Sequence, residues 1–379
     1  MYGANQSLCT LILELRDKYH INPVVLLKNE GSICDFLNEY SIRYYIINFY
    51  WWVNSDKGIF QKVLNIRKQF RNSLKVDKFI EIIKKENIDL LYTNSTTINI
   101  GALLHKKLNI PHIWHFRESL DQFHFKFSLG KYYSKRLLKN GADQYVLISK
   151  FLLKDYSSFL PKDKTAIIYN GVQLSQQTMA KLKEDRWFNL CVVGIVCEQK
   201  NQLDALKAIR ILVKEKGYTN IRMHLIGGAN EAYLKIISDY IDSERLKDYV
   251  LFHGHIKDVH NLMSKMDIGL ICARDEAFGR VSVEYMLHRL PVVASNSGAN
   301  SELVIPGISG DLYELNNSID LAAKIENYIN NPDLIKKTGN SACDFAKANF
   351  SSESNTREIY EVIKEVMSKT KFNKLRSHF

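Results

Sequence analysis

Residues 276–284 read Glu276-Ala-Phe-Gly-Arg-Val-Ser-Val-Glu284, two carboxylates that bracket seven residues with a single glycine among them. The apolar stretch Ile268–Ala273 precedes this segment, and Pro291-Val-Val-Ala-Ser295 follows it shortly afterwards. This order predicts strand, loop, helix and strand, with the helix beginning near Gly279. The N–H groups at the start of a helix lack intrahelical partners, and with the helix dipole they form an anion site. The segment therefore suits a ligand that carries both phosphate and sugar hydroxyl groups.

The same alternation of strand, loop and helix runs along the whole chain. It predicts parallel sheets covered on both faces, and the length of 379 residues favours two domains. We place one domain at 1–172, a polar linker at 173–187, a second domain at 188–350 and a C-terminal helix at 351–379. The strands are expected at Pro23–Leu27, Tyr44–Ile47, Leu90–Thr93, His112–His115, Gln144–Ile148, Thr165–Tyr169, Leu190–Ile195, Arg222–Ile226, Val250–His253, Ile268–Cys272 and Val292–Ser295.

The positive charge of the chain is concentrated in its first half. Residues 1–170 hold 25 lysine and arginine residues against 15 acidic residues, whereas residues 171–379 hold 27 against 26. The stretches 61–85 and 126–139 carry most of the excess, and aromatic residues lie upstream between Tyr44 and Trp52. This pattern suits an anionic membrane surface or a polyanionic acceptor, although a solvated helix face above core aromatics would look the same. No nucleic-acid-binding motif accompanies the charge, so nucleic acid is not an expected partner.

Several classes of protein are disfavoured by what the sequence lacks. The six cysteines form no C-x-x-C pair and lie mostly in apolar runs. This is typical of cysteines in the cores of proteins from a reducing cytosol. No apolar run is long enough to cross a bilayer and no signal peptide is recognisable, which predicts a cytoplasmic chain, in contact with a membrane only from its surface. There is no Asp-x-Asp motif, so neither a metal that bridges a diphosphate nor another cofactor is expected.

An ordered set of short motifs matches a known family. In the second half these are Val193-Gly194, Lys200-Asn201, Leu225-Ile-Gly-Gly228, Phe252-His-Gly254, Asp267, the 276–284 segment, Pro291–Ser295, Gly298 and Glu302. In the first half they are Tyr2-Gly-Ala4, Ser7, Asn94-Ser95, Trp114-His-Phe-Arg-Glu118, Ser149 and Tyr169-Asn-Gly-Val172. Over almost its whole length the chain resembles the retaining glycosyltransferases of family 4. That resemblance implies the GT-B fold, in which two Rossmann-like domains face each other across a cleft, and a C-terminal helix that packs back on the N-terminal domain.

The resemblance also implies roles for individual residues. Glu276 would hold the hydroxyls of the donor sugar, Lys200 would neutralise the diphosphate, and His115 would lie near the reacting centre. Glu284 would bind the ribose, and the backbone at Arg280, Val281 and Ser282 would hold the diphosphate. The remaining donor-binding positions implied are Phe278, Gly279, Gly194 and Gly3, and the acceptor-binding positions are Asn94 and Arg117.

Structural alternatives remain open for several of these residues. Glu276 could merely complement a helix dipole, Glu284 could be a solvated helix residue, and Lys200 could be a surface lysine. His115 follows an apolar strand and could be a core histidine, while Arg117 and Glu118 could form an ion pair that shapes the cleft. We expect His253 and His255 to be structural, because a metal pair needs further ligands.

The function implied is transfer of a sugar, with retention at the anomeric carbon, from a UDP- or GDP-sugar to a hydroxyl group. The basic first domain would hold the acceptor, a glycan or a polyprenyl-diphosphate-linked glycan, in assembly of bacterial capsule, O-antigen or exopolysaccharide at the inner face of the plasma membrane. The main alternative is a non-catalytic sugar-nucleotide binder or scaffold. A phosphorylase or hydrolase of the same fold and a general polyanion-binding protein explain the motifs less well.

Two positions depart from the family pattern. Ile195 stands where the family often has an arginine directly after the glycine matched by Gly194, so Arg274 or Arg280 would have to supply that charge. The loop at Tyr2–Ala4 also lacks the apolar strand that should precede it, and this strand normally lies inside the sheet. A sheet without it would leave backbone groups unpaired in the core. We therefore expect Met1 to be an internal start, or the protein to be impaired; codons for an apolar segment upstream of Met1 would support the first view.

Overall fold

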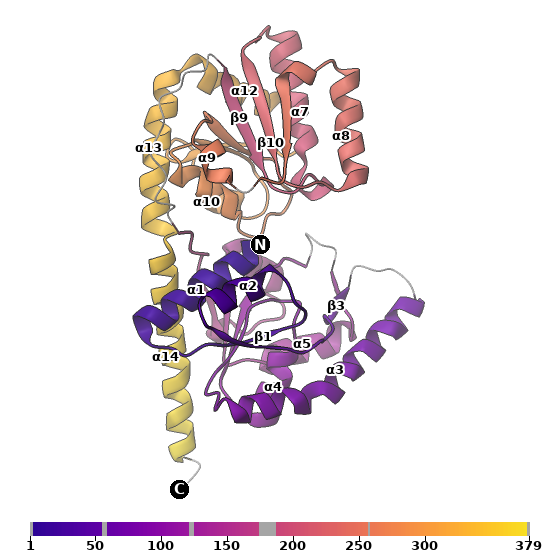
Figure 1. Ribbon diagram of the computed structural model, residues 1–379, viewed down its shortest axis with the longest axis vertical. Helices are drawn as coiled ribbons and strands as arrows, with labels where there is room; N and C mark the ends of the chain where they lie inside the picture. The colour runs from indigo at the N-terminus through magenta and orange to yellow at the C-terminus, as the bar shows by residue number, and fades with distance from the viewer. Residues whose placement is uncertain (1–2, 55–58, 121–124, 174–186, 257, 377–379) are drawn as a thin grey trace. The chain divides into compact units, whose positions relative to one another are not determined.

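The computed structural model describes residues 3–54, 59–120, 125–173, 187–256 and 258–376. The chain divides into two compact units, which are treated separately (Figure 1). Unit 1 comprises Met1–Gly171 with Ser352–Phe379, and unit 2 comprises Val172–Ser351. The linker predicted at 173–187 falls almost wholly outside the described residues.

Unit 2 contains one six-stranded parallel sheet in the order β11-β10-β9-β12-β13-β14. Its strands are β9 (Phe188–Val193), β10 (Ile221–Ile226), β11 (Val250–Gly254), β12 (Ile268–Ile271), β13 (Val292–Ser295) and β14 (Gly310–Tyr313). Relabelled from the first strand of the unit, this is the doubly wound order 3-2-1-4-5-6. The inner strands β9, β10, β12 and β13 are mostly buried and rich in valine, isoleucine and leucine, as parallel strands between two layers of helices must be. The edge strand β11 exposes Leu251 and Phe252.

The helices of unit 2 cover both faces of that sheet. They are α7 (Gln202–Arg210), α8 (Glu231–Ser243), α9 (Val259–Met263), α10 (Arg280–Leu287), α11 (Asn300–Leu303), α12 (Ser318–Asn330) and α13 (Pro332–Asn349). Short 3-10 turns lie at Glu198–Lys200 and Lys247–Tyr249, and a π-helical turn at Ile211–Glu215 extends α7. Tyr285 of α10 crosses β12 at Gly269, where a side chain would meet its ring at 2.2 Å, and so α10 lies tightly against the sheet.

Unit 1 divides its strands among three sheets. A parallel sheet has the order β4-β5-β7-β8, a parallel pair joins β1 to β2, and an antiparallel pair joins β3 to β6. The strands are β1 (Val24–Leu27), β2 (Arg43–Ile46), β3 (Val53–Asn54), β4 (Leu91–Thr93), β5 (His112–Phe116), β6 (Lys126–Phe127), β7 (Gln144–Leu147) and β8 (Thr165–Ile167). The helices are α1 (Gly3–Tyr19), α2 (Ser32–Glu39), α3 (Ile59–Lys85), α4 (Ile100–Leu108), α5 (Gly130–Asn140), α6 (Lys150–Tyr156) and α14 (Ser352–Arg376), with a 3-10 turn at Lys162–Lys164.

The C-terminal helix α14 packs in unit 1 beside α1 (Figure 1). Leu11 and Leu15 of α1 share a buried cluster with Ile359 and Ile363 of α14. The rings of Tyr19 and Tyr360 stack with their centroids 4.1 Å apart. The last helix of the sequence thus belongs to the core of the first unit.

A gap separates the two parallel sheets of unit 1. Among the described residues, β1 has β2 as its only strand neighbour and β4 has only β5, so each strand leaves one edge without a ladder. A cavity of about 1360 Å³ lies between these edges, lined by both strands and by residues of α1 and α14. Alternate residues of a parallel strand direct their N–H and C=O groups to opposite edges, so both strands present unpaired groups to this cavity. Among the described residues, the parallel strands of unit 1 therefore form a sheet in two parts.

Five of the six cysteines are buried, as the sequence suggested, and all six are free thiols. Burial raises the pKa of Cys9 to about 11 and that of Cys191 and Cys272 to about 12. None of the helices, over the residues described, has a stretch apolar enough and poor enough in charge to cross a bilayer.

Candidate functional site

The switch point of the unit 2 sheet lies between β9 and β12, the two strands from which the chain winds in opposite directions. Ligands of doubly wound folds bind at such a point, beyond the carboxyl ends of the strands. Gly194 and Ile195 follow β9 there, and the loop that carries Glu276 follows β12. Sheet order alone thus brings the predicted donor residues of unit 2 to one edge.

Lys200 and Glu276 form an ion pair at this edge, with 2.5 Å between Nζ and Oε2. They are 76 positions apart in sequence, and the backbone N–H of Arg274, which donates to the carbonyl of Gln199 at 2.9 Å, ties their two loops together. The side chains are 32% and 15% exposed, so both can meet a ligand. Burial opposes the charged ammonium, but the charge of Glu276 and its hydrogen bond outweigh burial, and the pKa of Lys200 lies above its ordinary value.

A second ion pair lies one turn inside α10. Arg280 Nε donates to Glu284 Oε1 at 2.8 Å, and the two side chains are 18% and 16% exposed. The spacing of four residues puts both on one helix face. Glu276 and Glu284 are the carboxylates predicted to hold the donor's hydroxyl groups. Each is paired with a cation, Lys200 or Arg280, that is expected to lie near the diphosphate.

The loop that carries Glu276 is hydrogen-bonded to the loop that follows β13. The carbonyl of Glu276 accepts the N–H of Ala299 at 2.7 Å, and Ser297 Oγ accepts the N–H of Asp275 at 3.0 Å. Gly298 has φ +59°, and a Cβ there would lie 2.4 Å from the nitrogen of Glu276. Only glycine fits this close approach, so Gly298 positions Glu276, a role that the sequence had not assigned.

Gly279, with the left-handed φ of +76°, caps the N-terminus of α10, which begins at Arg280. The N–H of Ser282 donates to the carbonyl of Gly279 at 2.9 Å, so this predicted diphosphate donor is already used within the turn. The buried hydroxyl of Ser282 has no partner among the described residues. The first-turn amides of α10, at Arg280 and Val281, have no intrahelical acceptor, as at any helix start.

Phe278 does not present its ring to a ligand. The side chain is 2% exposed and meets Phe350 edge to face, with 5.9 Å between the ring centroids. The donor contact predicted for Phe278 is therefore restricted to its backbone, because the ring belongs to the core.

Gly194 leaves β9 with φ +140°, and Gly227 approaches its carbonyl so closely that a Cβ on Gly227 would lie 2.2 Å away. The next residue, Ile195, is 45% exposed. Of the two arginines predicted to replace its missing charge, Arg280 is in the pair with Glu284, and Arg274 donates to Asn316 Oδ1 at 3.1 Å. Both cations thus lie on loops or helices that border the Lys200–Glu276 pair.

His115, Asn94 and Arg117 form a separate group in unit 1. His115 Nδ1 is 2.5 Å from the hydroxyl of Tyr92, and Arg117 Nε donates to Asn94 Oδ1 at 2.7 Å. Arg117 also donates to Asn170 Oδ1. Burial first, and then the charge of Arg117, holds the pKa of His115 well below its ordinary value, so the imidazole is neutral. Its Nε2 is buried with no partner among the described residues.

The other predicted residues are placed as follows. Gly3 is the first residue of α1 and is exposed. Glu118 accepts from Ser95 Oγ at 2.9 Å and from the N–H of Thr96 at 2.8 Å, so it organises the loop after β4. His253 Nε2 lies 2.9 Å from His224 Nδ1, a structural contact between β11 and β10. No group of three or more metal-ligating side chains is found within the described ranges.

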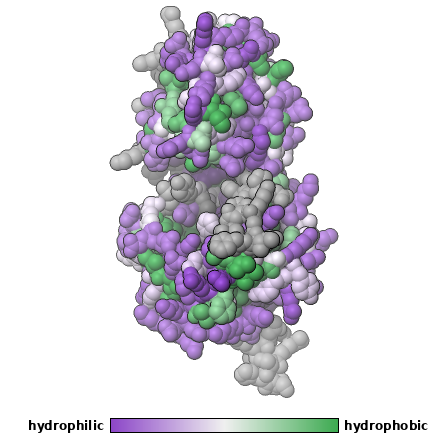
Figure 2. Space-filling view, turned by 90° about the vertical axis from the view of Figure 1, so that its right-hand side faces the viewer, coloured by the Kyte–Doolittle hydropathy of each residue, from purple (hydrophilic) through white to green (hydrophobic). Residues whose placement is uncertain are grey.

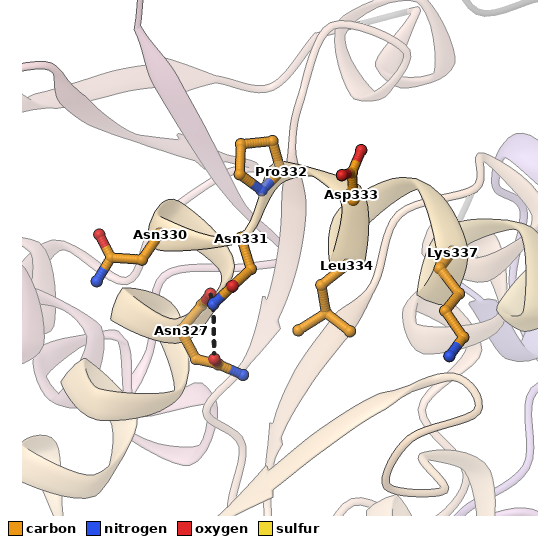
Figure 3. Close-up of a pocket in the computed structure, with 7 residues that line it drawn as sticks. All are labelled: Asn327, Asn330, Asn331, Pro332, Asp333, Leu334 and Lys337. Atoms are coloured by element: carbon orange, nitrogen blue, oxygen red, sulfur yellow. Dashed lines mark hydrogen bonds between the residues drawn. The ribbon is translucent and has the colours of Figure 1, made fainter.

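A shallow hollow of about 480 Å³ lies elsewhere in unit 2, at the turn between α12 and α13 (Figure 3). The side chain of Asn331 bridges back to Asn327 with bonds of 2.8 and 3.1 Å, and Asp333 points away from them. None of the predicted site residues lines this hollow, so we assign it no function.

Two family models match this chain, and together they span most of its length. The model of the family "Glycosyl transferases group 1" matches residues 174–344, and that of "Glycosyltransferase Family 4" matches residues 3–176. Uncharacterized glycosyltransferase MJ1178 of Methanocaldococcus jannaschii is 31% identical over 78% of this chain and 80% of its own length. Capsular polysaccharide biosynthesis glycosyltransferase CapH of Staphylococcus aureus is 27% identical over 60% of this chain and 64% of its own.

Among solved structures, Alr3699/HepE of Anabaena in complex with UDP superposes with a TM-score of 0.78 at 22% identity and covers 96% of both chains. At that identity the likeness shows the GT-B fold alone. Each unit described above fits that fold through its own parallel sheets.

Proposed function

Because the chain belongs to the group 1 glycosyltransferases of the family 4 type, with the GT-B fold, we propose that it moves a sugar from a nucleoside-diphosphate donor to a hydroxyl acceptor, with retention of anomeric configuration and without a metal ion. The donor is a UDP- or GDP-sugar. The acceptor is a glycan, or a glycan carried on a polyprenyl diphosphate, in bacterial surface polysaccharide assembly. The work is done in the cytoplasm, at the inner face of the membrane.

The observation that carries this proposal is the pairing of Lys200 with Glu276 and of Arg280 with Glu284 beside the first turn of α10. The two cations and the helix start suit a diphosphate, and the two carboxylates suit vicinal hydroxyl groups. On binding, a donor would replace each ion pair with two contacts: its phosphate oxygens would contact the cation, and its hydroxyl groups would contact the carboxylate. The site therefore keeps its charges neutralised until a ligand with both groups arrives.

The chemistry asks for little more than this. The bond between the anomeric carbon and the diphosphate oxygen breaks, and a bond from the acceptor oxygen forms on the same face of the sugar. The acceptor proton passes to the leaving phosphate oxygen. Lys200 carries its positive charge at neutral pH and stabilises the charge that builds on that oxygen, as a metal would in other transferases.

The biological setting is inferred from relatives and from charge. CapH is named for capsular polysaccharide biosynthesis, and HepE was solved with UDP. The excess of basic residues lies in the first 170 positions, which are predicted to hold the acceptor. A diphosphate-linked acceptor and the anionic membrane that carries it both suit this charge.

One observation favours a second candidate, a sugar-nucleotide binder that does not turn over. Ile195, 45% exposed, stands where the resemblance described above implies an arginine. Such a protein would bind the donor and release no free nucleoside diphosphate with any acceptor.

The test begins with a panel of UDP-, GDP- and ADP-sugars to identify the donor by thermal shift. Transfer is then followed with lipid extracts as the acceptor source, and the anomeric configuration of the product is read by NMR. Lys200→Met and Glu276→Gln should each lower transfer by about 100-fold or more, and EDTA should not. The matched control is another ion pair of unit 2, Lys216–Glu326 at 3.2 Å, whose variants Lys216→Met and Glu326→Gln should transfer normally. Full transfer activity in both site variants would refute the assignment of the site. A product with inverted anomeric configuration, or loss of transfer in EDTA, would refute the mechanism.

A further inference from the structure

Helix α3 changes character along its length. In its C-terminal half Val76, Phe79 and Ile83 are 5%, 1% and 4% exposed, and they pack on residues of β4 and α4. Figure 1 shows α3 and α4 lying together in unit 1. This half is an ordinary amphipathic helix, with its apolar side in the core.

In the preceding half the buried side is polar. Asn65, Gln69 and Asn72 are 4%, 5% and 0% exposed. The amide of Asn72 exchanges two hydrogen bonds of 2.8 Å with the backbone of Tyr50, and Gln69 Nε2 donates to the carbonyl of Trp51 at 2.7 Å. These amides satisfy the backbone of an irregular segment, so here the helix is fixed to the unit by hydrogen bonds and not by its apolar residues.

The apolar residues of this half face outward instead. Val63, Ile66, Phe70 and Leu74 are 46%, 51%, 65% and 65% exposed. At 3.6 residues per turn their positions fall within about 80° of one another, as one stripe along the helix. Among the described residues, no element covers the apolar side of this half of α3, which turns its amides inward and its phenylalanine and leucine outward.

Cations border this stripe. Arg67, Arg71 and Lys78 lie together along one flank, about 40–80° from Val63, and Arg67 and Lys78 are well exposed. Beyond Leu74 the same side of α3 carries two acids, Asp77, which is paired with Lys107 at 2.7 Å, and Glu81. Figure 2 views unit 1 from the side toward which α3 extends in Figure 1, and apolar and hydrophilic surfaces lie intermixed there.

We propose that this outer side of α3, defined by Val63, Ile66, Phe70 and Leu74 with Arg67, Arg71 and Lys78, is a membrane-contact face for an anionic lipid bilayer. The stripe enters the boundary between headgroups and acyl chains, and the guanidinium and ammonium groups meet lipid phosphates. The inference rests on the proposed function for its purpose, which is to bring unit 1 to a lipid-linked acceptor. A second copy of the chain is a poorer occupant, because it would place two cationic flanks against each other.

The test is cosedimentation of the full chain with vesicles of phosphatidylcholine alone and of phosphatidylcholine with phosphatidylglycerol. We expect binding only to the anionic vesicles, weakened by salt. The double variant Phe70→Ser, Leu74→Ser should lower partitioning by at least about tenfold, and Arg71→Glu by at least about fivefold. Because Phe70, Leu74 and Arg71 are exposed, the variants should fold normally. Thermal stability is checked alongside, since Arg71 also hydrogen-bonds to Tyr50.

Matched controls lie on exposed helix faces of unit 2. Ile319, 73% exposed on α12, is changed to Ser, and Lys336 of α13 is changed to Glu; both should bind vesicles like the parent. The proposal is overturned if the parent ignores anionic vesicles, if Phe70→Ser, Leu74→Ser binds as well as the parent, or if the stripe proves to hold a dimer that this variant splits. Donor binding in lipid-free buffer is measured in parallel, because it reports on the proposed function alone and separates the two failures.

Discussion

At the scale of single residues, the buried histidines of β5 show how the fold selects a protonation state. His112 is fully buried, with Nδ1 2.6 Å from the carbonyl of Gly141 and Nε2 2.8 Å from the hydroxyl of Thr93. The carbonyl requires a proton on Nδ1, and the neutral ring can then accept from Thr93 through Nε2. Burial is the main cause that lowers the pKa of His112 to about 3.

This histidine should make the protein sensitive to acid. The unfolded chain takes up the proton near pH 6.5, whereas the folded chain resists it down to about pH 3, so the unfolded state binds more protons between these values. The free energy of unfolding should therefore fall as the pH falls below 6.5, by about 2 kcal/mol from this group at pH 5.

Urea unfolding at pH 7 and pH 5 measures that loss. The variant His112→Asn should start less stable at pH 7 but lose about 2 kcal/mol less on acidification than the parent. The exposed His20, changed to Asn, serves as the control and should keep the parent's dependence. Equal acid sensitivity in the parent and in His112→Asn would show that this ring does not resist protonation.

At the scale of elements, the loop between β12 and α10 depends on the loop after β13. The approach of Gly298 to the backbone of Asp275 and Glu276 is what sets the carboxylate of Glu276 against Lys200. Neither loop is regular structure. They are joined by the bond from the N–H of Ala299 to the carbonyl of Glu276 and by two bonds between Asp275 and the Ser297 hydroxyl.

Gly298→Ala should therefore weaken both stability and donor binding. The new Cβ would lie 2.4–2.6 Å from backbone atoms of Asp275 and Glu276, on a residue with φ +59°. We expect a loss of about 1–3 kcal/mol in unfolding free energy and a donor affinity at least about tenfold lower, by calorimetry. Gly31→Ala, at an extended residue with nothing within 4 Å, should change neither. If Gly298→Ala bound the donor as tightly as the parent, Gly298 would not be needed to position the donor site.

The sequence predicted the elements whose own residues determine them. Long apolar runs between helical patterns placed the strands of the unit 2 sheet, with the exception of β14, where Gly310-Asp-Leu-Tyr313 is too short and mixed to indicate a strand. The two-residue strands β3 and β6 escaped for the same reason. The outward apolar side of α3 also escaped, because periodicity locates a stripe but not the side that faces the core.

Within the site, spacing and tertiary contact contributed differently. The pair of Arg280 and Glu284 follows from a separation of four residues in a helix, and the sequence could have shown it. The pair of Lys200 and Glu276 depends on the order of β9 and β12, and the role of Gly298 depends on a contact between loops. Neither of these follows from local sequence.

At the scale of the whole molecule, the main departure from a continuous doubly wound sheet lies in unit 1. There the parallel strands are divided between two sheets, β1-β2 and β4-β5-β7-β8. The cavity between β1 and β4 is bordered by apolar side chains such as Val25, Leu26 and Leu91 and by two strand edges. Residues near the carboxyl ends of both strands, Lys28 and Asn94, line it together with Asn5 near the start of α1. A parallel strand placed there would thus end close to the start of α1.

An engineered extension ahead of Met1 should fill this gap. About six alternating valine and isoleucine residues, joined by a short glycine-containing turn, would pair with both edges and bury their side chains. We expect the melting temperature to rise by at least about 5 °C, with slower amide exchange in β1 and β4. The same extension with alternate residues changed to lysine is the control and should not stabilise. Equal melting temperatures for the two extensions would mean that the cavity does not accept a strand.

The most direct test of the central claim is calorimetric titration of the donor's nucleoside diphosphate and of the intact nucleotide sugar, into the parent, Lys200→Met and Glu276→Gln. Lys200 is proposed to bind the diphosphate, and Glu276 the sugar. Lys200→Met should therefore weaken both ligands by a similar factor. Glu276→Gln should leave the nucleoside diphosphate within about threefold of the parent and remove the added affinity of the sugar. If Glu276→Gln weakens both ligands equally, or if Lys200→Met weakens neither, the ion pair is not the donor site.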